Sequence, residues 1–305
     1  MISLVKELWR TLLFLFSIQF WRMGLLWTFS IVFSHHQLIK DFFCSQRPKS
    51  YYRCSPCVVP VRPVAVVTGN IWPGILYCLR TFQRRICCCA WRKERSKLGI
   101  EMRTSKLFRM IGTNYIGAFV LTNLLLPLLE SSNVSSRIVN VTSFTHRNVT
   151  DMQVDDRTVS GKRFLSYMQY PYANIYEYSK LFLLLFTFEL HRQLRLREKS
   201  HQIFVAAADP GVVQTNILRE VPSLLSLSAH FVLKYLGLLQ SPEYGVSSII
   251  DAALAPPGTS GAYFFGGIGR TIEPSILSRD AGLALKLWET TSNLLSTTPF
   301  GTEED

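Results

Sequence analysis

The sequence predicts an α/β fold built on a doubly wound parallel sheet with helices on both faces. Three observations favour this class. An apolar strand, Pro63–Gly69, closes on Thr-Gly; strands and long helices alternate from Met110 onward; and polar residues follow the ends of two of those strands. We expect the sheet to be incomplete in its N-terminal half and to be preceded by a hydrophobic anchor helix.

The second half of the chain has the more regular pattern. Residues 113–132 predict a helix, and Arg137–Ser143 predicts a buried strand that closes on hydroxyl groups. A long helix follows around Tyr176, and a second buried strand, HQIFVAAAD, ends in Pro210-Gly211. Strand, helix and strand at this spacing are typical of βαβ units, whose ligands bind beyond the carboxyl ends of the parallel strands.

Charge and cysteine content exclude several classes of protein. The chain has 305 residues and a formal net charge of +12. Ten Arg or Lys and two Glu fall between Arg80 and Arg109, so most of the excess lies in one stretch. No basic and aromatic repeat supports nucleic-acid binding, and we expect no nucleic-acid partner. Cys54-x-x-Cys57 lacks the second ligand pair of a zinc site, so no metal is expected.

Residues 1–40 predict a membrane-anchor segment. Thr11–Phe33 has 23 residues with a single charge, Arg22, and about 20 apolar residues span a bilayer as a helix. A charge near the middle is costly in hydrocarbon, so two arrangements stay open. One is a single-pass helix with a snorkelling arginine, and the other is an interfacial segment or hairpin broken near this residue. The alternative is a helix buried in the soluble domain. Residues 41–62 predict a basic linker.

The chemistry is concentrated in Tyr176-x-x-x-Lys180. On a helix, residues four apart share a face, and a lysine ammonium lowers the pKa of a nearby phenol by favouring its ionised form. The phenol then exchanges a proton with an alcohol or carbonyl, and Ser143 holds the same substrate oxygen by a hydrogen bond. The spacing alone is common on solvated helix faces. Its specificity comes from its order with Thr68-Gly69, Asn114, Ser143 and Pro210-Gly211.

This constellation resembles the short-chain dehydrogenase/reductase family over Pro63–Gly69 and Met110–Gly267. The resemblance implies a Rossmann-type fold and an NAD(P)-dependent oxidoreductase. The family's catalytic set maps to Asn114, Ser143, Tyr176 and Lys180. In the family the tyrosine is the general acid/base, the lysine binds the nicotinamide ribose and lowers the tyrosine pKa, the serine orients the substrate, and the asparagine holds a water in a proton relay.

The resemblance also implies a cofactor, NADP or NAD, and an alcohol or carbonyl substrate. The cofactor-binding residues would be Thr68, Gly69, Tyr176, Lys180, Pro210, Gly211, Val213 and Thr215. Within the family the chain is most similar to the plant membrane-associated branch of chloroplast import-linked and retinol-dehydrogenase-like proteins. The apolar region Leu224–Leu239 and the hydrophobic N-terminal segment favour a lipid-like substrate. The catalytic domain would lie in the cytosol or the stroma.

Two spacings depart from the family. Ser143 and Tyr176 are 33 positions apart, and the charged residues Asp151–Arg163 predict a surface excursion between them. Gly69 and Asn114 are 45 positions apart, whereas the elements expected there need about 90 residues, at roughly 30 for each βαβ unit. We expect residues 70–109 to replace the glycine loop and strands 2 to 4, within a dehydrogenase-like domain at 63–295 followed by an acidic tail at 296–305.

Residues 70–109 have neither strand alternation nor a helical stripe, and a frame-shifted reading accounts for them. Trp has a single codon, so Trp72-Pro73 read one base later gives Gly. Cys87 to Cys89 read in the same way gives Val or Ala three times. With suitable codons the shifted frame contains the missing glycine loop, first helix and second strand. Genomic and transcript sequence across codons 66 to 110 tests this hypothesis.

Three functional hypotheses follow from the sequence. The first is a membrane-anchored oxidoreductase that uses proton and hydride transfer at the Tyr-Lys-Ser set. The second is a cofactor-less pseudoenzyme or membrane-bound interaction protein, because a chain without the glycine loop offers the cofactor pyrophosphate no helix N-terminus. The third is a non-functional truncated product of splicing or gene prediction. Binding of NADPH by the purified chain separates the first hypothesis from the other two.

Overall fold

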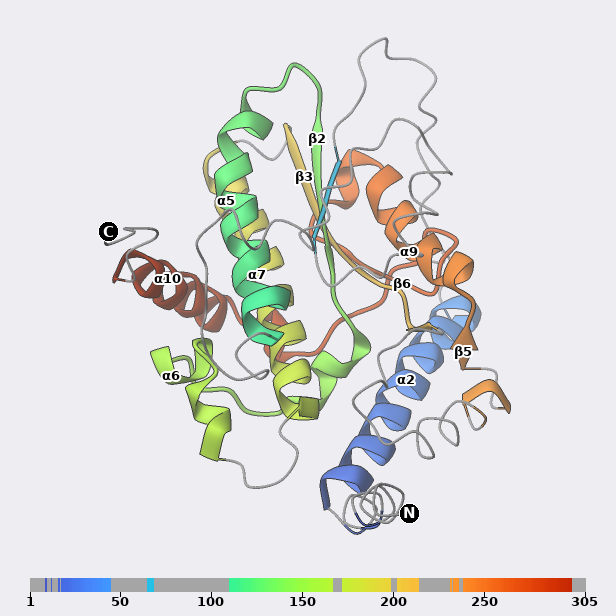
Figure 1. Ribbon diagram of the computed structural model, residues 1–305. Coiled ribbons are helices and arrows are strands. Elements are labelled where there is room, and N and C mark those ends of the chain that lie inside the picture. The colour runs from blue at the N-terminus through green and yellow to red at the C-terminus, as the bar shows by residue number, and fades with distance from the viewer. Residues whose placement is uncertain are drawn as a thin grey trace, which may run out of the picture.

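The computed structural model describes residues 18–44, 65–68, 110–166, 172–198, 202–213 and 238–297, together with isolated positions near residues 9–16 and 231–235. The principal elements, in chain order, are α2 (Ile18–Cys44), β1 (Ala65–Thr68), η2 (Gly112–Ile116), α5 (Gly117–Glu130), β2 (Ser136–Val141), η3 (Phe144–Asn148), α6 (Asp156–Val159), η4 (Lys162–Ser166), α7 (Tyr172–Leu196), β3 (Ile203–Asp209), β4 (Val212–Val213), β5 (Leu239–Gln240), α9 (Pro242–Leu254), η6 (Pro257–Thr259), β6 (Tyr263–Phe265), η7 (Leu277–Arg279) and α10 (Ala281–Thr297). Figure 1 shows how these elements are arranged.

The main sheet of the described residues has four strands in the order β1-β2-β3-β6, and every pairing is parallel. Its register pairs Val139 with Ala206 and Ala208 with Phe264. All seven residues of β3 are buried, which is typical of a parallel strand that is covered on both faces. The parallel sheet confirms the α/β class that the sequence predicts.

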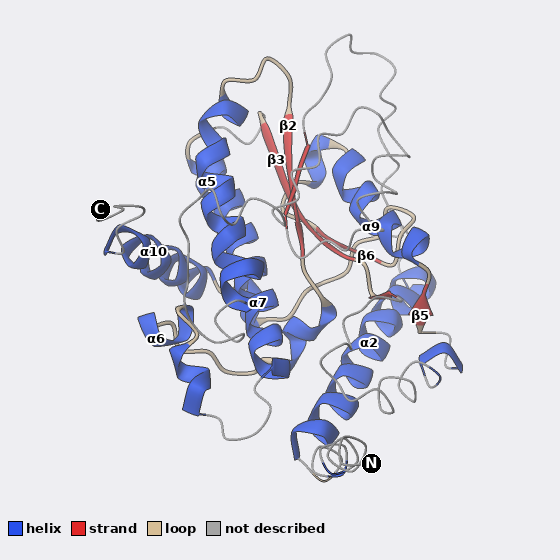
Figure 2. Ribbon diagram, viewed as in Figure 1, coloured by secondary structure: helices blue, strands red, loops and turns tan. Residues whose placement is uncertain are grey.

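Helices cover both faces of the sheet, so the fold is doubly wound (Figure 2). Successive residues of each strand point to opposite faces. Ile138 and Val205 pack in the core beneath α5, α7 and α10, whereas Val139 and Ala206 pack in the core beneath α9. The two cores explain why these strands are apolar at almost every position instead of alternating.

The N-terminal half of the sheet is short of a strand among the described residues. β1 pairs directly with β2, from Ala65 opposite Arg137 to Thr68 opposite Asn140. In the strand order 3-2-1-4-5-6 of a doubly wound sheet, strand 4 lies between strands 1 and 5. The resemblance implies that the catalytic serine follows the fifth strand, so β2 would take the place of strand 5, with β1 directly beside it. This arrangement agrees with the short spacing before Asn114; residues 69–109 lie outside the described part.

The hydrophobic N-terminal helix is part of the packed domain. α2 continues to Cys44, beyond the boundary predicted at residue 40, and it packs on η3. Its inward-facing Ile31 and Leu38 belong to a buried cluster with Phe144 and Phe265. In its described part, α2 thus packs on the domain with one side and exposes large apolar residues on the other, so it is not the fully buried helix that the sequence offered as the alternative.

One helix of the described chain is long and apolar enough to cross a membrane, and it spans Gly112–Glu130. Half of its most apolar window is buried inside the domain. Tyr115 and Phe119 pack edge-on or tilted against Phe182 and Phe186 of α7. Its apolar composition is accounted for by its place in the core.

The charged segment before α7 differs from the predicted surface excursion. It forms α6 and η4, and its apolar side chains Val159 and Phe164 are almost fully buried. The charges stay outside, where Asp155 caps α6 by accepting a hydrogen bond from the Thr158 backbone N–H at 2.7 Å. The prediction that this segment leaves the domain surface was wrong. Its few apolar side chains pack into the core, and its more numerous charged side chains lie on the outer side.

Candidate active site

The predicted catalytic residues come together where two strands and one helix meet. β2 ends at Val141 and is followed by Ser143, β3 ends at Asp209, and the first turns of α7 carry the Tyr-x-x-x-Lys motif. The strands remain in register beyond β2, because the Thr142 backbone N–H donates to the carbonyl of Ala208 at 2.9 Å. The site therefore lies at the carboxyl edge of a parallel sheet, as the sequence predicts.

The Ser143 and Tyr176 side chains lie close enough to interact, and this interaction lowers the pKa of Tyr176 in part. Ser143 is buried and precedes η3, and its Oγ also accepts a long hydrogen bond of 3.4 Å from the Thr145 backbone N–H. This cap fixes where the hydroxyl lies relative to the strand end. A carbonyl or alcohol oxygen placed beside both hydroxyls would contact a hydrogen-bonding group and a proton-transfer group at once.

Lys180 lies on the same face of α7 as Tyr176, one turn further on. Its Nζ donates to the carbonyl of Val141 at 2.9 Å and lies 5.6 Å from the centre of the Tyr176 ring. Burial lowers the pKa of Lys180 to about 8, and the charge of Asp209 opposes this change. At neutral pH the side chain is therefore still largely an ammonium ion, the form that stabilises a phenolate.

The pKa of Tyr176 differs from the sequence-based expectation of a lowered value. Burial raises it well above its ordinary value, the interaction with Ser143 lowers it in part, and the charge of Asp209 raises it. Desolvation is the largest of these effects, and the Lys180 Nζ donates its hydrogen bond to the strand carbonyl of Val141. In this structure the phenol is held protonated, the form that acts as an acid.

Asn114 is tied to the catalytic helix through one intermediate residue. It lies in η2, a π-helical turn that continues into α5, and its side chain is buried. The Asn114 Nδ2 donates to the Ser179 Oγ at 3.0 Å, and the Ser179 Oγ donates to the carbonyl of Tyr176 at 2.8 Å. Single π-helical turns inside helices are frequent at functional sites. Ser179, which the sequence analysis did not single out, connects the two.

Asp209 is a second residue that sequence reasoning missed. It is completely buried, and it accepts hydrogen bonds from the Tyr263 hydroxyl at 2.6 Å and from the Gly211 backbone N–H at 2.8 Å. Burial raises the pKa of Asp209, whereas these hydrogen bonds and the charges of Arg147 and Lys180 lower it. The available signal was an acidic residue at the end of an otherwise apolar strand, directly before Pro-Gly.

His146 lies in η3, three residues after Ser143, and its side chain is neutral. Its Nε2 accepts a hydrogen bond from the Ser275 backbone N–H at 3.1 Å, so the proton is on Nδ1, which donates to the carbonyl of Ser143 at 2.7 Å. Burial lowers the pKa of His146 to about 3, and the charge of Arg147 adds to this change. The histidine that follows Ser143 by three is thus a fully buried structural residue.

The folded chain is expected to become less stable as the pH is lowered, because of His146. The unfolded chain binds a proton at this residue near its ordinary pKa of 6.5, whereas the folded chain does so only near 3. Between these values the unfolded state is favoured by roughly 1.4 kcal/mol for each unit of decreasing pH. Urea unfolding at several values between pH 7 and pH 4 measures this slope. In the His146→Gln variant this slope should be smaller by about 1.4 kcal/mol per pH unit, the contribution of one proton. Equal slopes in both proteins would contradict the lowered pKa of His146.

The predicted cofactor residues are only partly described. Thr68 ends β1 at the same sheet edge, opposite Asn140. Val213 lies in the short strand β4, which pairs with β5 just beyond the Pro210-Gly211 turn. Gly69 and Thr215 lie outside the described residues.

The described end of this site fits the nicotinamide half of a dinucleotide. Gly211 has φ +72°, and a Cβ added to it would lie 3.1 Å from the Gln240 Oε1, so this turn requires glycine. A lysine ammonium has three N–H donors, and Lys180 gives one of them to the carbonyl of Val141. In the described residues its ammonium is therefore able to donate also to the hydroxyls of a ribose. The pyrophosphate half cannot be assigned residues from the described ranges.

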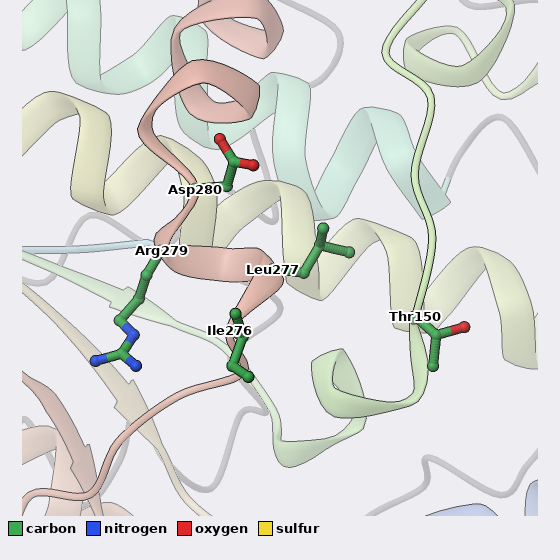
Figure 3. A pocket seen from close by; sticks show the side chains of 5 residues that line it. All are labelled: Thr150, Ile276, Leu277, Arg279 and Asp280. Carbon is green, nitrogen blue, oxygen red and sulfur yellow. The ribbon is translucent and has the colours of Figure 1, made fainter.

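A separate open hollow of about 490 Å³ lies beside α10 (Figure 3). It is lined by Thr150, Ile276, Leu277, Arg279 and Asp280. None of the predicted catalytic or cofactor residues lines it, and we assign no ligand to it.

The chain is similar to several curated dehydrogenases, although no protein-family model matches it. It is 37% identical to polyprenol dehydrogenase of Mus musculus over 187 residues, which are 59% of this chain and 51% of that protein. It is 35% identical to retinol dehydrogenase 14 of Homo sapiens over 193 residues, 62% of this chain and 52% of that protein. It is 31% identical to the chloroplastic short-chain dehydrogenase TIC 32 B of Brassica napus over 194 residues, 61% of this chain and 57% of that protein. The chain thus spans about half the length of the curated relatives it matches.

A solved structure supports the fold. The crystal structure of an uncharacterised protein from Mycobacterium paratuberculosis superposes with a TM-score of 0.52 and 21% identity, over 83% of this chain and all of that one. This likeness shows that the two chains share a fold.

Proposed function

We propose that this chain is a member of the short-chain dehydrogenase/reductase family and an NAD(P)-dependent oxidoreductase, acting on an alcohol or carbonyl at the Ser143, Tyr176 and Lys180 site. The observation that carries the proposal is the contact set itself. Ser143 lies beside Tyr176 and lowers the pKa of its hydroxyl in part, and the Lys180 ammonium lies 5.6 Å from the tyrosine ring at the same sheet edge. Neither Asn114 nor the strand-end turn is needed to define this set, although both support it.

In carbonyl reduction Tyr176 would act as the acid. Its raised pKa keeps the phenol protonated at neutral pH, and it would give this proton to the substrate oxygen while Ser143 donates a hydrogen bond to the same atom. The Lys180 ammonium would stabilise the phenolate left behind. In alcohol oxidation the proton moves the other way, from the substrate hydroxyl to Tyr176.

The cofactor would supply or accept the hydride at the substrate carbon. In our proposal Lys180 holds the nicotinamide ribose and the Pro210-Gly211 turn lies against the nicotinamide, with Thr68 near the same edge. Asn114 would position α7 through Ser179, and a water beside it would complete a proton relay. Asp209 would balance the charge of the buried ammonium.

We infer an apolar, lipid-like substrate and a position at a membrane surface. The names of two relatives specify polyprenol and retinol, both apolar alcohols. The outward side of α2 exposes large apolar residues, namely Trp21, Leu25, Phe29, Val32, Ile39 and Phe43. With the other side of α2 packed on the domain, an interfacial helix is favoured over a spanning one. The catalytic domain would then face the cytosol or the stroma.

A second candidate function is a membrane-bound pseudoenzyme without cofactor. The observation that favours it is the direct pairing of β1 with β2, which omits a strand of the cofactor-binding half. Without a glycine loop at a helix N-terminus, the pyrophosphate lacks its usual binding site. A non-functional truncated product predicts the same loss of binding together with a chain that does not fold.

Titration of the purified full chain with NADPH, followed by nicotinamide fluorescence, separates these functions. An oxidoreductase is expected to show saturable binding in roughly the micromolar range. Lys180→Met should abolish this binding by removing the ammonium, whereas Lys286→Met, on the exposed side of α10, should leave it unchanged. A folded chain with no saturation below about 1 mM would support the cofactor-less function instead.

A further inference from the structure

The helix predicted as an anchor lies against the catalytic residues. α2 packs on η3, the segment that directly follows Ser143. Figure 1 shows α2 below the carboxyl ends of the central strands, beside the chain that leaves β2. The inner side of the helix is buried at Ile31, Ser34 and Leu38. α2 therefore lies where it would contact a substrate that approaches Tyr176 from this side.

A buried carboxylate attaches α2 to the catalytic helix. Glu177, the residue after Tyr176, has no exposed surface, and it accepts hydrogen bonds from Arg22 at 2.6 Å and from the Trp27 indole N–H at 2.7 Å. The Asn148 amide of η3 donates a third bond at 3.2 Å. Removing one partner of a buried ion pair leaves an uncompensated charge, so this carboxylate requires α2. The same arginine also donates to Asn174.

A second set of contacts fixes α2 further along its length. The Arg147 guanidinium of η3 donates to the Ser34 hydroxyl at 3.2 Å and to the Gln37 side chain at 3.3 Å. It also lies over the Phe33 ring, 5.4 Å from its centre. The segment of α2 between Arg22 and Ser34 is thus held at both ends, and Trp27 lies between them.

Trp27 is the residue that this attachment brings to the site. Its ring centre lies 5.9 Å from that of Tyr176, at 44°. We propose that α2 forms one wall of the substrate site and that Trp27 is a specificity-determining residue, held in place by Glu177. The inference rests on the proposed oxidoreductase function for the meaning of the site, but the docking of α2 does not depend on it.

The charge arrangement explains why a spanning helix is disfavoured here. Insertion of the segment into a bilayer as a separate helix would remove Arg22 and Trp27 from Glu177. It would leave the carboxylate unpaired beside the catalytic tyrosine and would carry the arginine into hydrocarbon. Arg22, which the sequence marked as a costly membrane charge, has a protein partner 155 positions away.

Binding of all-trans-retinol to the full chain, followed by its own fluorescence, tests the wall directly. Trp27→Ala is expected to weaken binding about fivefold, because an aromatic contact is lost. Leu25→Ala, which removes an exposed apolar side chain from the same helix, should stay within about twofold of the wild type. Trp27→Phe keeps a ring but not the indole N–H and should restore most of the affinity. Wild-type binding in the Trp27→Ala variant would overturn the inference; if that variant does not fold, Trp27→Leu replaces it, with the same expected loss.

A double-mutant cycle tests the attachment independently. Arg22→Met, Glu177→Gln and the double variant are compared with the wild type by thermal unfolding. The double variant is expected to be clearly less destabilised than the sum of the two single variants, because the partners are in contact. Strictly additive effects would show that α2 is not held by this pair and would overturn the proposed docking.

Failure of the inference and failure of the proposed function give different results. Retinol binding and the unfolding cycle need neither cofactor nor turnover. If the wild-type chain does not bind NADPH but both the retinol-binding test and the unfolding cycle give the expected results, the oxidoreductase function is refuted and the proposed α2 wall stands. NADP-dependent oxidation of retinol with the same KM in wild type and Trp27→Ala would refute the wall alone.

Discussion

Replacing Tyr176 with Phe is expected to lower kcat/KM for NAD(P)-dependent turnover by about 10²–10⁴-fold, because it removes the hydroxyl that transfers the proton. The ring and its contact with Trp27 remain, so the fold and the binding of an apolar alcohol should change little. Steady-state kinetics with retinol and NADP, together with the affinity for NADPH, measure the effect. A loss confined to KM would indicate a binding role instead of proton transfer.

Tyr178→Phe is the matched control for this experiment. Tyr178 lies two residues further along α7, and its hydroxyl donates to the carbonyl of Asp151 at 2.9 Å, away from Ser143. Its ring packs on Phe164 at 5.0 Å between centres. Removing this hydroxyl should leave kcat/KM within about twofold and reduce stability by about 1 kcal/mol. Equal losses in the two variants would contradict the assignment of Tyr176 as the acid.

Replacing Asp209 with Ala is expected to destabilise the folded chain by about 2–4 kcal/mol. The change leaves the buried Tyr263 hydroxyl and the half-buried Gly211 N–H without their acceptor. It also removes the opposing charge that raises the pKa of Lys180, so this pKa should fall below its present value of about 8. Urea unfolding measures the free energy, and the pH dependence of the lysine reactivity measures the pKa.

Asp280→Ala provides a comparison with an exposed carboxylate. Asp280 accepts a hydrogen bond from the Leu283 backbone N–H at 2.9 Å near the start of α10. Loss of such a cap costs about 1 kcal/mol. A destabilisation by Asp209→Ala no larger than that of Asp280→Ala would show that the buried network contributes little and that Asp209 has no special role.

The sequence predicted those parts of the fold and the site that depend on local pattern. Apolar strands with hydroxyl or Pro-Gly ends predicted β2, β3 and the sheet edge at which these strands end. The structure confirms the two strands and their common edge. The spacing of Tyr176 and Lys180 placed them on one helical face, and the order of motifs placed Ser143 beside them. The shortage of residues before Asn114 predicted an incomplete sheet.

The sequence by itself therefore determined the α/β class and predicted that Ser143, Tyr176 and Lys180 lie together, because these follow from periodicity and from motif order along the chain. Only the tertiary structure decided the partners of Arg22, the burial of Asp209 and His146, and the raised pKa of Tyr176. Ion pairs between positions 155 apart, and the loss of water around a group, depend on how distant elements pack. No window of the sequence contains that information, and so the apolar N-terminal helix could be interpreted as an anchor until its inner side was seen against the catalytic helix.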